Sequence, residues 1–246
     1  LKCCFCIAAL FAGIAPAFGA CDDPPAPQVN WYGCDLSERD FSGKDLRGAV
    51  FSNSTLRATI FSDAVLNGAD FEGARLEGAD LRNAQLVHAR FINANLHKAR
   101  LEQANIANAR FDRADLRDTM LERCNGENAS FYDANLSRAH LTLCQLPGAN
   151  FEQANLTGAD FSNAVLTKAR FSDATLEKAK LQNANLQKAK LMTANLSGTD
   201  VSHADLTQAD LTGAEIAGAT FKDAILANTV WIDRRRCKPI SVGECQ

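Results

Sequence analysis

The sequence has few of the features expected of a nucleic-acid-binding or catalytic chain. Its formal net charge is only −3, from 26 basic and 29 acidic residues, so the charge balance gives no electrostatic case for a nucleic-acid partner. It contains neither a glycine-rich phosphate-binding loop nor the nucleophile elbow of hydrolases. Trp and Tyr occur only twice each, whereas Phe occurs 14 times, which favours a position that requires one type of ring.

Long apolar runs are also missing, except near the N-terminus. There a single charge, Lys2, precedes an apolar run from Cys3 to Ala15, followed by Pro16 and small residues up to Ala20. This order is typical of a secretory signal peptide, and the run is too short to span a bilayer comfortably. We therefore expect export to a periplasmic or extracellular location, with no transmembrane segment in the mature chain. A start at Ala20 gives a soluble protein, and a start at Cys21 leaves a lipoprotein anchored there as the alternative.

The remainder of the chain is built on a period of five residues. From Leu36 to Trp231, every fifth residue occupies what we term the central position, and Gly126 is the only one that is not large and apolar. Two residues before each centre is the small position, which is Ala in thirty of the forty units. This period fits neither an α-helix nor a flat strand, and it predicts a chain that turns a corner every five residues.

The central residues further separate into four columns when they are sorted in steps of twenty. In one column the central residues are almost all aromatic. In the column that begins at Leu36, they are Leu in nine successive coils. A period of five alone would not separate Phe from Leu, so four sides should close one coil of twenty residues, each coil buried by its neighbours. The aromatic column, which we term the Phe column, consists of Trp31, Phe51, Phe71, Phe91, Phe111, Phe131, Phe151, Phe171 and, after two Leu residues, Trp231.

The recurring unit of Ala, then Asp or Asn, then Leu or Phe resembles the pentapeptide-repeat family over about 200 residues, for example at Ala79-Asp80-Leu81. The resemblance implies an all-β fold, a right-handed quadrilateral parallel β-helix, here with about ten coils. We expect a signal peptide at 1–20, an N-terminal cap at 21–33, the β-helix at 34–233 and a C-terminal cap at 234–246.

The ends of a solenoid need caps, because a terminal coil is an exposed edge. The six cysteines outside the predicted signal peptide suit an oxidising compartment and fall into three neighbouring pairs. Two pairs should close cap loops by disulfides, Cys21 with Cys34 and Cys237 with Cys245. The basic run from Arg234 to Arg236 is either part of a solvated cap or a patch for an anionic partner.

The middle of the chain contains two further irregularities. Cys124 and Cys144 are twenty residues apart at small positions, so they should be stacked neighbours, either bridged or as paired buried thiols. Gly126 removes a large side chain beside them. This change predicts either a tolerated irregularity or a notch that could bind a ligand at residues 124–127.

These patterns favour a non-catalytic module that binds a partner protein or an envelope component. No two of the four histidines share both a repeat position and a side, so no metal or cofactor site is expected. A rod without inserted loops also lacks the concave pocket that an enzyme requires, which argues against a glycan-active β-helix enzyme. The family includes DNA mimics that bind type II topoisomerases, but the forty units hold 26 acidic and 21 basic residues, a weak charge for a DNA mimic. The four histidines, for which no metal site is expected, are His88, His97, His140 and His203.

Overall fold

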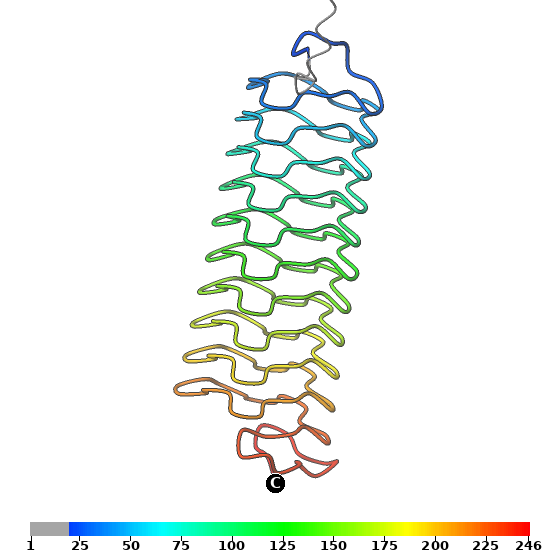
Figure 1. The fold of residues 1–246 in the computed structure, drawn as a ribbon. Coiled ribbons are helices and arrows are strands. Elements are labelled where there is room, and N and C mark those ends of the chain that lie inside the picture. The colour runs from blue at the N-terminus through cyan, green and yellow to red at the C-terminus, as the bar shows by residue number, and fades with distance from the viewer. Residues whose placement is uncertain (1–19) are drawn as a thin grey trace, which may run out of the picture.

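The computed structural model describes residues 20–246, and the predicted signal peptide therefore lies outside the described residues except for Ala20. Figure 1 shows these residues as a straight rod of stacked coils, with the N-terminal coil at one end and the C-terminal segment at the other. Residues 20–246 contain no helix, and their backbone pairing consists of single-residue bridges rather than extended strands. None of this part of the chain could cross a membrane as a helix.

The coils are held together by a parallel backbone ladder with a step of twenty residues. The residue just before each centre, which we term the ladder position, pairs with the residue twenty earlier and the residue twenty later, as Asn105 does with Gln85 and Asn125. Its amide donates to the coil before, and the next central amide donates to the coil after, as in Ile106 N to Asn125 O at 2.7 Å. Four such ladders run along the rod, which is the predicted quadrilateral arrangement.

The corners between the ladders are formed by the two residues after each centre, the first and second turn positions. The amide of the following small residue closes each turn by donating to the central carbonyl, as Ala49 N does to Leu46 O at 3.0 Å. The residue at the second turn position has a positive φ in all units from Gln28 to Asn228, which is the left-handed conformation. Gly, Asn and Asp are frequent at this position because they adopt that conformation at the lowest cost.

The interior is filled by the central and small side chains. The rings of the Phe column stack face to face from Phe51 to Phe171, with centroids 4.6–5.0 Å apart, and all of them are fully buried. Trp31 packs on Phe51 at one end, at 5.5 Å, whereas Trp231 at the other end contacts Phe221. The ring spacing equals the ladder spacing of about 4.8 Å, so ring stacking and backbone pairing favour the same register.

The small positions that are not Ala follow two physical rules. Buried Ser and Thr residues there donate their hydroxyls to the central carbonyl of the coil before, as Thr199 does to Leu176 O at 2.7 Å. Arg39 and Lys44 are instead exposed, because they lie in the first coil and no coil covers them. The remaining hydroxyl donors are Ser54, Thr59, Thr119 and Thr229.

The Phe column should be highly sensitive to truncation. We predict that Phe111→Ala lowers the free energy of unfolding by about 3–5 kcal/mol, because a rod fixed by its ladders cannot collapse into the space that the ring leaves. Urea denaturation followed by circular dichroism measures the loss. Arg113→Ala, at an exposed corner of the same coil, is the control and should change stability by about 0.5 kcal/mol or less. Equal effects of the two substitutions would contradict the assignment.

Candidate binding faces and capped ends

Both ends of the rod carry a disulfide. The structure joins Cys21 to Cys34, with the Cα atoms 5.5 Å apart, and Cys237 to Cys245, with the Cα atoms 4.8 Å apart. The first bridge lies beside buried Trp31 and the second follows Trp231. Each predicted pair of cap cysteines is therefore brought together.

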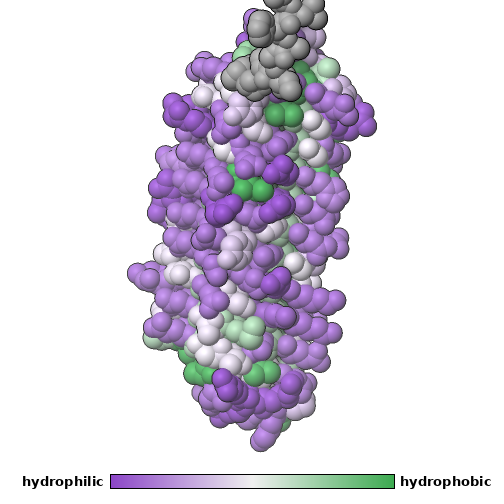
Figure 2. Space-filling model, in the orientation of Figure 1, coloured by the Kyte–Doolittle hydropathy of each residue, from purple (hydrophilic) through white to green (hydrophobic). Residues whose placement is uncertain are grey.

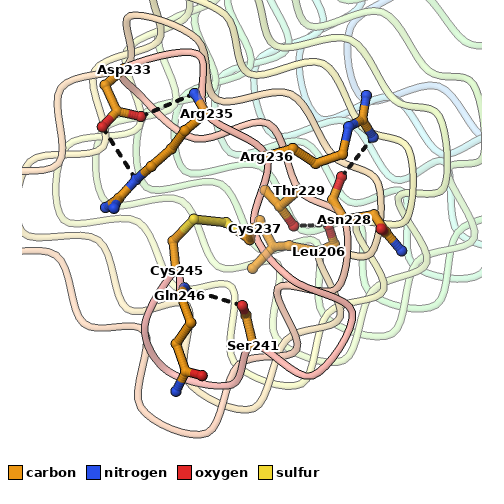
Figure 3. Close-up of a disulfide and its surroundings, with 10 residues drawn as sticks. All are labelled: Leu206, Asn228, Thr229, Asp233, Arg235, Arg236, Cys237, Ser241, Cys245 and Gln246. Atoms are coloured by element: carbon orange, nitrogen blue, oxygen red, sulfur yellow. Dashed lines mark hydrogen bonds and ion pairs between the residues drawn. A yellow bond between two sulfur atoms is a disulfide. The ribbon is translucent and has the colours of Figure 1, made fainter.

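The C-terminal cap covers part of the last coil by reversing direction. Val230 pairs with Arg236 and Ile225 with Val242, both in antiparallel fashion. Figure 3 shows the Cys237–Cys245 bridge beside this segment, where the Arg236 guanidinium donates to Asn228 O at 3.1 Å. Arg235 forms an ion pair with Asp233 at 3.2 Å. Two of the three residues of the basic run therefore have partners in the last coil, next to the cap.

The two central cysteines are free thiols in the structure, and both are fully buried. The Cys144 thiol donates to Leu121 O at 2.8 Å, in the same way as the buried hydroxyls of other coils. Burial raises the pKa of the Cys124 thiol well above its usual range, and the adjacent Cys144 adds to this effect. The pair therefore behaves as core side chains rather than as reactive thiols.

No notch is open at Gly126. A Cβ atom placed there would lie 2.7 Å from Leu146 Cδ2 and 3.1 Å from Ile106 Cγ1, so the central side chains of the two neighbouring coils fill the space. Of the two alternatives, the notch is wrong and the tolerated irregularity is confirmed, because the Ile106 and Leu146 side chains occupy the missing volume. The absence of a side chain at Gly126 therefore opens no ligand pocket at residues 124–127.

The outer faces are predominantly polar. Figure 2 shows one side of the rod, on which hydrophobic residues form only small, separated spots. The three arginines in the ladder of the Phe face are neutralised locally. Arg90 pairs with Glu72 at 2.6 Å. The remaining two pairs on this face are Arg110–Asp112 and Arg170–Glu152.

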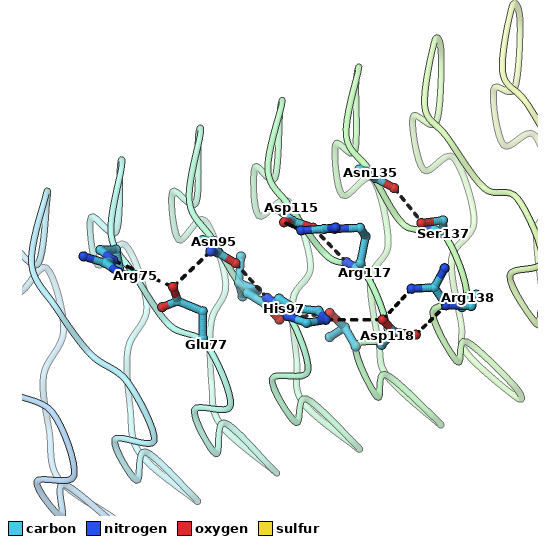
Figure 4. A network of polar contacts seen from close by, with 12 residues as sticks. Arg75, Glu77, Asn95, His97, Asp115, Arg117, Asp118, Asn135, Ser137 and Arg138 are labelled. Carbon is cyan, nitrogen blue, oxygen red and sulfur yellow. Dashed lines mark hydrogen bonds and ion pairs between the residues drawn. The ribbon is translucent and has the colours of Figure 1, made fainter.

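The next face along the coil carries a network of polar contacts over several coils, drawn in Figure 4. Asp118 accepts two hydrogen bonds from Arg138, at 2.7 and 2.8 Å, and lies 3.3 Å from His97 Nε2. The bonds from Arg138 are the main reason that the pKa of Asp118 is lowered to about 2. Within residues 20–246, no group of three or more His, Cys, Asp or Glu side chains is arranged to hold a metal ion.

Two family models match the chain over nearly the whole rod. One, described as pentapeptide repeat region, matches residues 27–101 and 94–171. The other, described as pentapeptide repeats in eight copies, matches residues 160–198, 169–208 and 189–228.

The chain belongs to the pentapeptide-repeat family. Its fold is the right-handed quadrilateral β-helix of that family, as the resemblance predicted.

Two solved structures of the family show this fold. HetL, from the cyanobacterium Nostoc, is described as a pentapeptide repeat protein involved in heterocyst differentiation regulation. It is 27% identical, with a TM-score of 0.61 over 85% of this chain and 92% of HetL. QnrB1, described as a plasmid-mediated fluoroquinolone resistance protein, is 22% identical, with a TM-score of 0.50 over 77% of this chain and 88% of QnrB1. None of the curated proteins matches the sequence.

The sequence patterns did not indicate every residue that differs from the regular polar surface. Met120 and Leu143 are exposed by 38% and 45%, on neighbouring coils of one face. The available signal was a large apolar residue at a ladder position and another at a second turn position, where most residues are polar.

Reduction of the disulfides should loosen the ends before the middle. Closing loops of 13 and 8 residues stabilises the caps by about 2–3 kcal/mol each in the chain-entropy model. We predict that reductant accelerates tryptic cleavage at Arg234, Arg235 and Arg236 and promotes association of rods on size-exclusion chromatography, because freed edges can pair. A Cys124→Ala/Cys144→Ala variant should respond equally. Initial cleavage in the central coils would contradict this prediction.

The Asp118–Arg138 pair gives a testable pH dependence. We predict that Arg138→Ala raises the pKa of Asp118 from about 2 towards about 3.9, its usual value. Because the folded-state pKa is lowered, the pair stabilises the protein above about pH 4, and this contribution is lost as the pH falls towards 2. Carboxyl ¹³C NMR titration measures the change. Asp115 is the internal control: its pKa is lowered by Arg117 and should stay low. An unchanged Asp118 pKa would refute the assigned cause.

Proposed function

We propose that this protein is an exported, non-catalytic binding rod whose polar faces dock a partner protein or an envelope component. The observation that carries the proposal is the regular outer surface. Each of the four sides follows its own parallel ladder, so groups on successive coils are presented at a fixed spacing of about 4.8 Å. A surface of this kind binds an extended partner without having to order itself first.

Two further observations support export. The first is the signal-like order of residues 1–20. The second is the pair of cap disulfides, which persist in oxidising compartments. The similarity to HetL, a protein described by a role in regulation rather than by a reaction, is in keeping with a binding role.

The charges argue against mimicry of DNA. A DNA mimic needs rows of uncompensated carboxylates, whereas the ladder of the Phe face carries Arg90, Arg110, Arg170 and Lys190. The three arginines of this ladder are also occupied by carboxylates of the same face. The likeness to QnrB1 concerns the fold.

Fractionation and partner capture test the proposal. We expect the mature chain in the periplasm or the medium, with its N-terminus at Ala20 or Cys21. Immobilised on a matrix and exposed to that fraction, it should retain a partner that immobilised HetL, a rod of the same fold, does not retain. A cytoplasmic chain that still contains Lys2 would contradict export. Protection of DNA from a topoisomerase at sub-stoichiometric amounts would contradict the choice of partner.

A further inference from the structure

Acidic residues at first turn positions are usually neutralised in one of two ways. The cation is an arginine at the ladder position either of the same coil, two residues earlier, or of the next coil, eighteen residues later. The ion pairs of the first kind include Arg100–Glu102 and Arg110–Asp112, and those of the second kind are Arg90–Glu72 and Arg170–Glu152, with N–O distances of 2.6–2.9 Å.

Glu122 has neither kind of arginine partner. The ladder position of its own coil is Met120, and that of the next coil is His140, whose Nδ1 lies 4.0 Å from Glu122 Oε1 and is charged only when protonated. Arg123, the next residue, forms no ion pair with it among the described contacts. The other oxygen, Glu122 Oε2, is buried without a hydrogen-bond partner.

This combination distinguishes Glu122 from other glutamates of the rod. Glu77 and Glu102 also bury an unpartnered oxygen, but each has an arginine near its other oxygen. Glu127, at the first turn position of the next face, likewise lacks an arginine. It is exposed to water, however, and the ladder position of its unit is Asn125 rather than an apolar residue. Glu122 is therefore a half-buried carboxylate whose ion pair is incomplete.

Two exposed apolar residues lie on the same face as this carboxylate, one on its own coil and one on the next coil. Met120 is 38% exposed where Arg100 stands one coil earlier, and Leu143 is 45% exposed on the following coil. Leu143 also has a φ of 62°, and it is the one large apolar side chain among the non-glycine left-handed corners of residues 20–246. Exposure and left-handed backbone both cost free energy for a leucine, so neither is explained by the stability of the rod alone.

We propose that Met120, Glu122 and Leu143 form a docking site for a protein segment that presents an arginine beside an apolar side chain. The partner's guanidinium supplies the cation that Met120 does not, and it pairs with Glu122 as Arg100 pairs with Glu102. The aliphatic part of that arginine lies on Met120, and the neighbouring apolar side chain covers Leu143. The inference rests on the proposed binding function and specifies the chemistry of one partner site.

Methyl NMR with a defined peptide tests the site, because the chain has only two methionines, Met120 and Met192. The probe is the acetylated tripeptide amide Leu-Arg-Leu, compared with Leu-citrulline-Leu, in which a neutral group of the same shape replaces the guanidinium. The Met120 methyl signal should shift saturably with the arginine peptide and far less with the citrulline peptide. Met192, half-buried on the Phe face, should not respond.

Paired variants assign the effect to Glu122. Glu122→Gln should lower the affinity for the arginine peptide by about five-fold, the upper range for one accessible ion pair. Glu127→Gln removes the same charge from the neighbouring face and should leave the affinity unchanged. An unshifted Met120 signal, equal binding of the two peptides, or equal loss in the two variants would overturn the proposal.

Capture of the natural partner separates this inference from the broader function. Met120→Arg restores the arginine–glutamate arrangement of the rod, so the variant should fold and melt normally. It should nevertheless retain less of the natural partner than the normal rod does. If the normal rod captures a partner and both Met120→Arg and Glu122→Gln capture it equally, this site is wrong and the scaffold function stands. If the normal rod captures nothing, the scaffold function fails, and the peptide titration still judges the site.

Discussion

The parallel backbone ladder with its step of twenty residues is the constraint on which the other features of this protein depend. Because each ladder residue pairs with the coil on either side, the register of one coil fixes the register of the next. The same step brings like side chains into stacks, so the Phe rings pack at the ladder spacing. It also leaves the two terminal coils with one neighbour each, which is why the disulfides and the antiparallel C-terminal segment lie at the ends.

The period of five and the segregation of Phe from Leu were sufficient to predict the coil, its four sides and its core, because both patterns arise directly from which side chains face inward. Details that depend on the neighbouring coils were less accessible. Arg39 and Lys44 are exposed at small positions because no coil covers them, and the sequence pattern alone does not show this. The space at Gly126 is closed by the side chains of Ile106 and Leu146, which no spacing argument predicts.

A rod this regular can distinguish one partner from another mainly through departures from its own pattern. Its ion pairs are mostly satisfied within one coil or between adjacent coils, so they give solubility without exposing free charge. Against that background, an incomplete pair at Glu122, on the same face as exposed Met120 and Leu143, is a local exception in both charge and polarity. Recognition by shape would come from the rod, and recognition by chemistry from such exceptions.

Amide hydrogen exchange resolved by residue tests the central claim, that parallel ladders with a step of twenty residues organise the rod from Asn30 to Val230. In the middle coils the amides of the small, ladder, central and second turn positions donate to backbone carbonyls, whereas those of the first turn position donate at most to a side chain. The account predicts slow exchange with one fast amide in every five residues, sustained through the middle coils, with protection declining only at the ends. A profile without this period, or with its weakest protection in the middle coils, would contradict it.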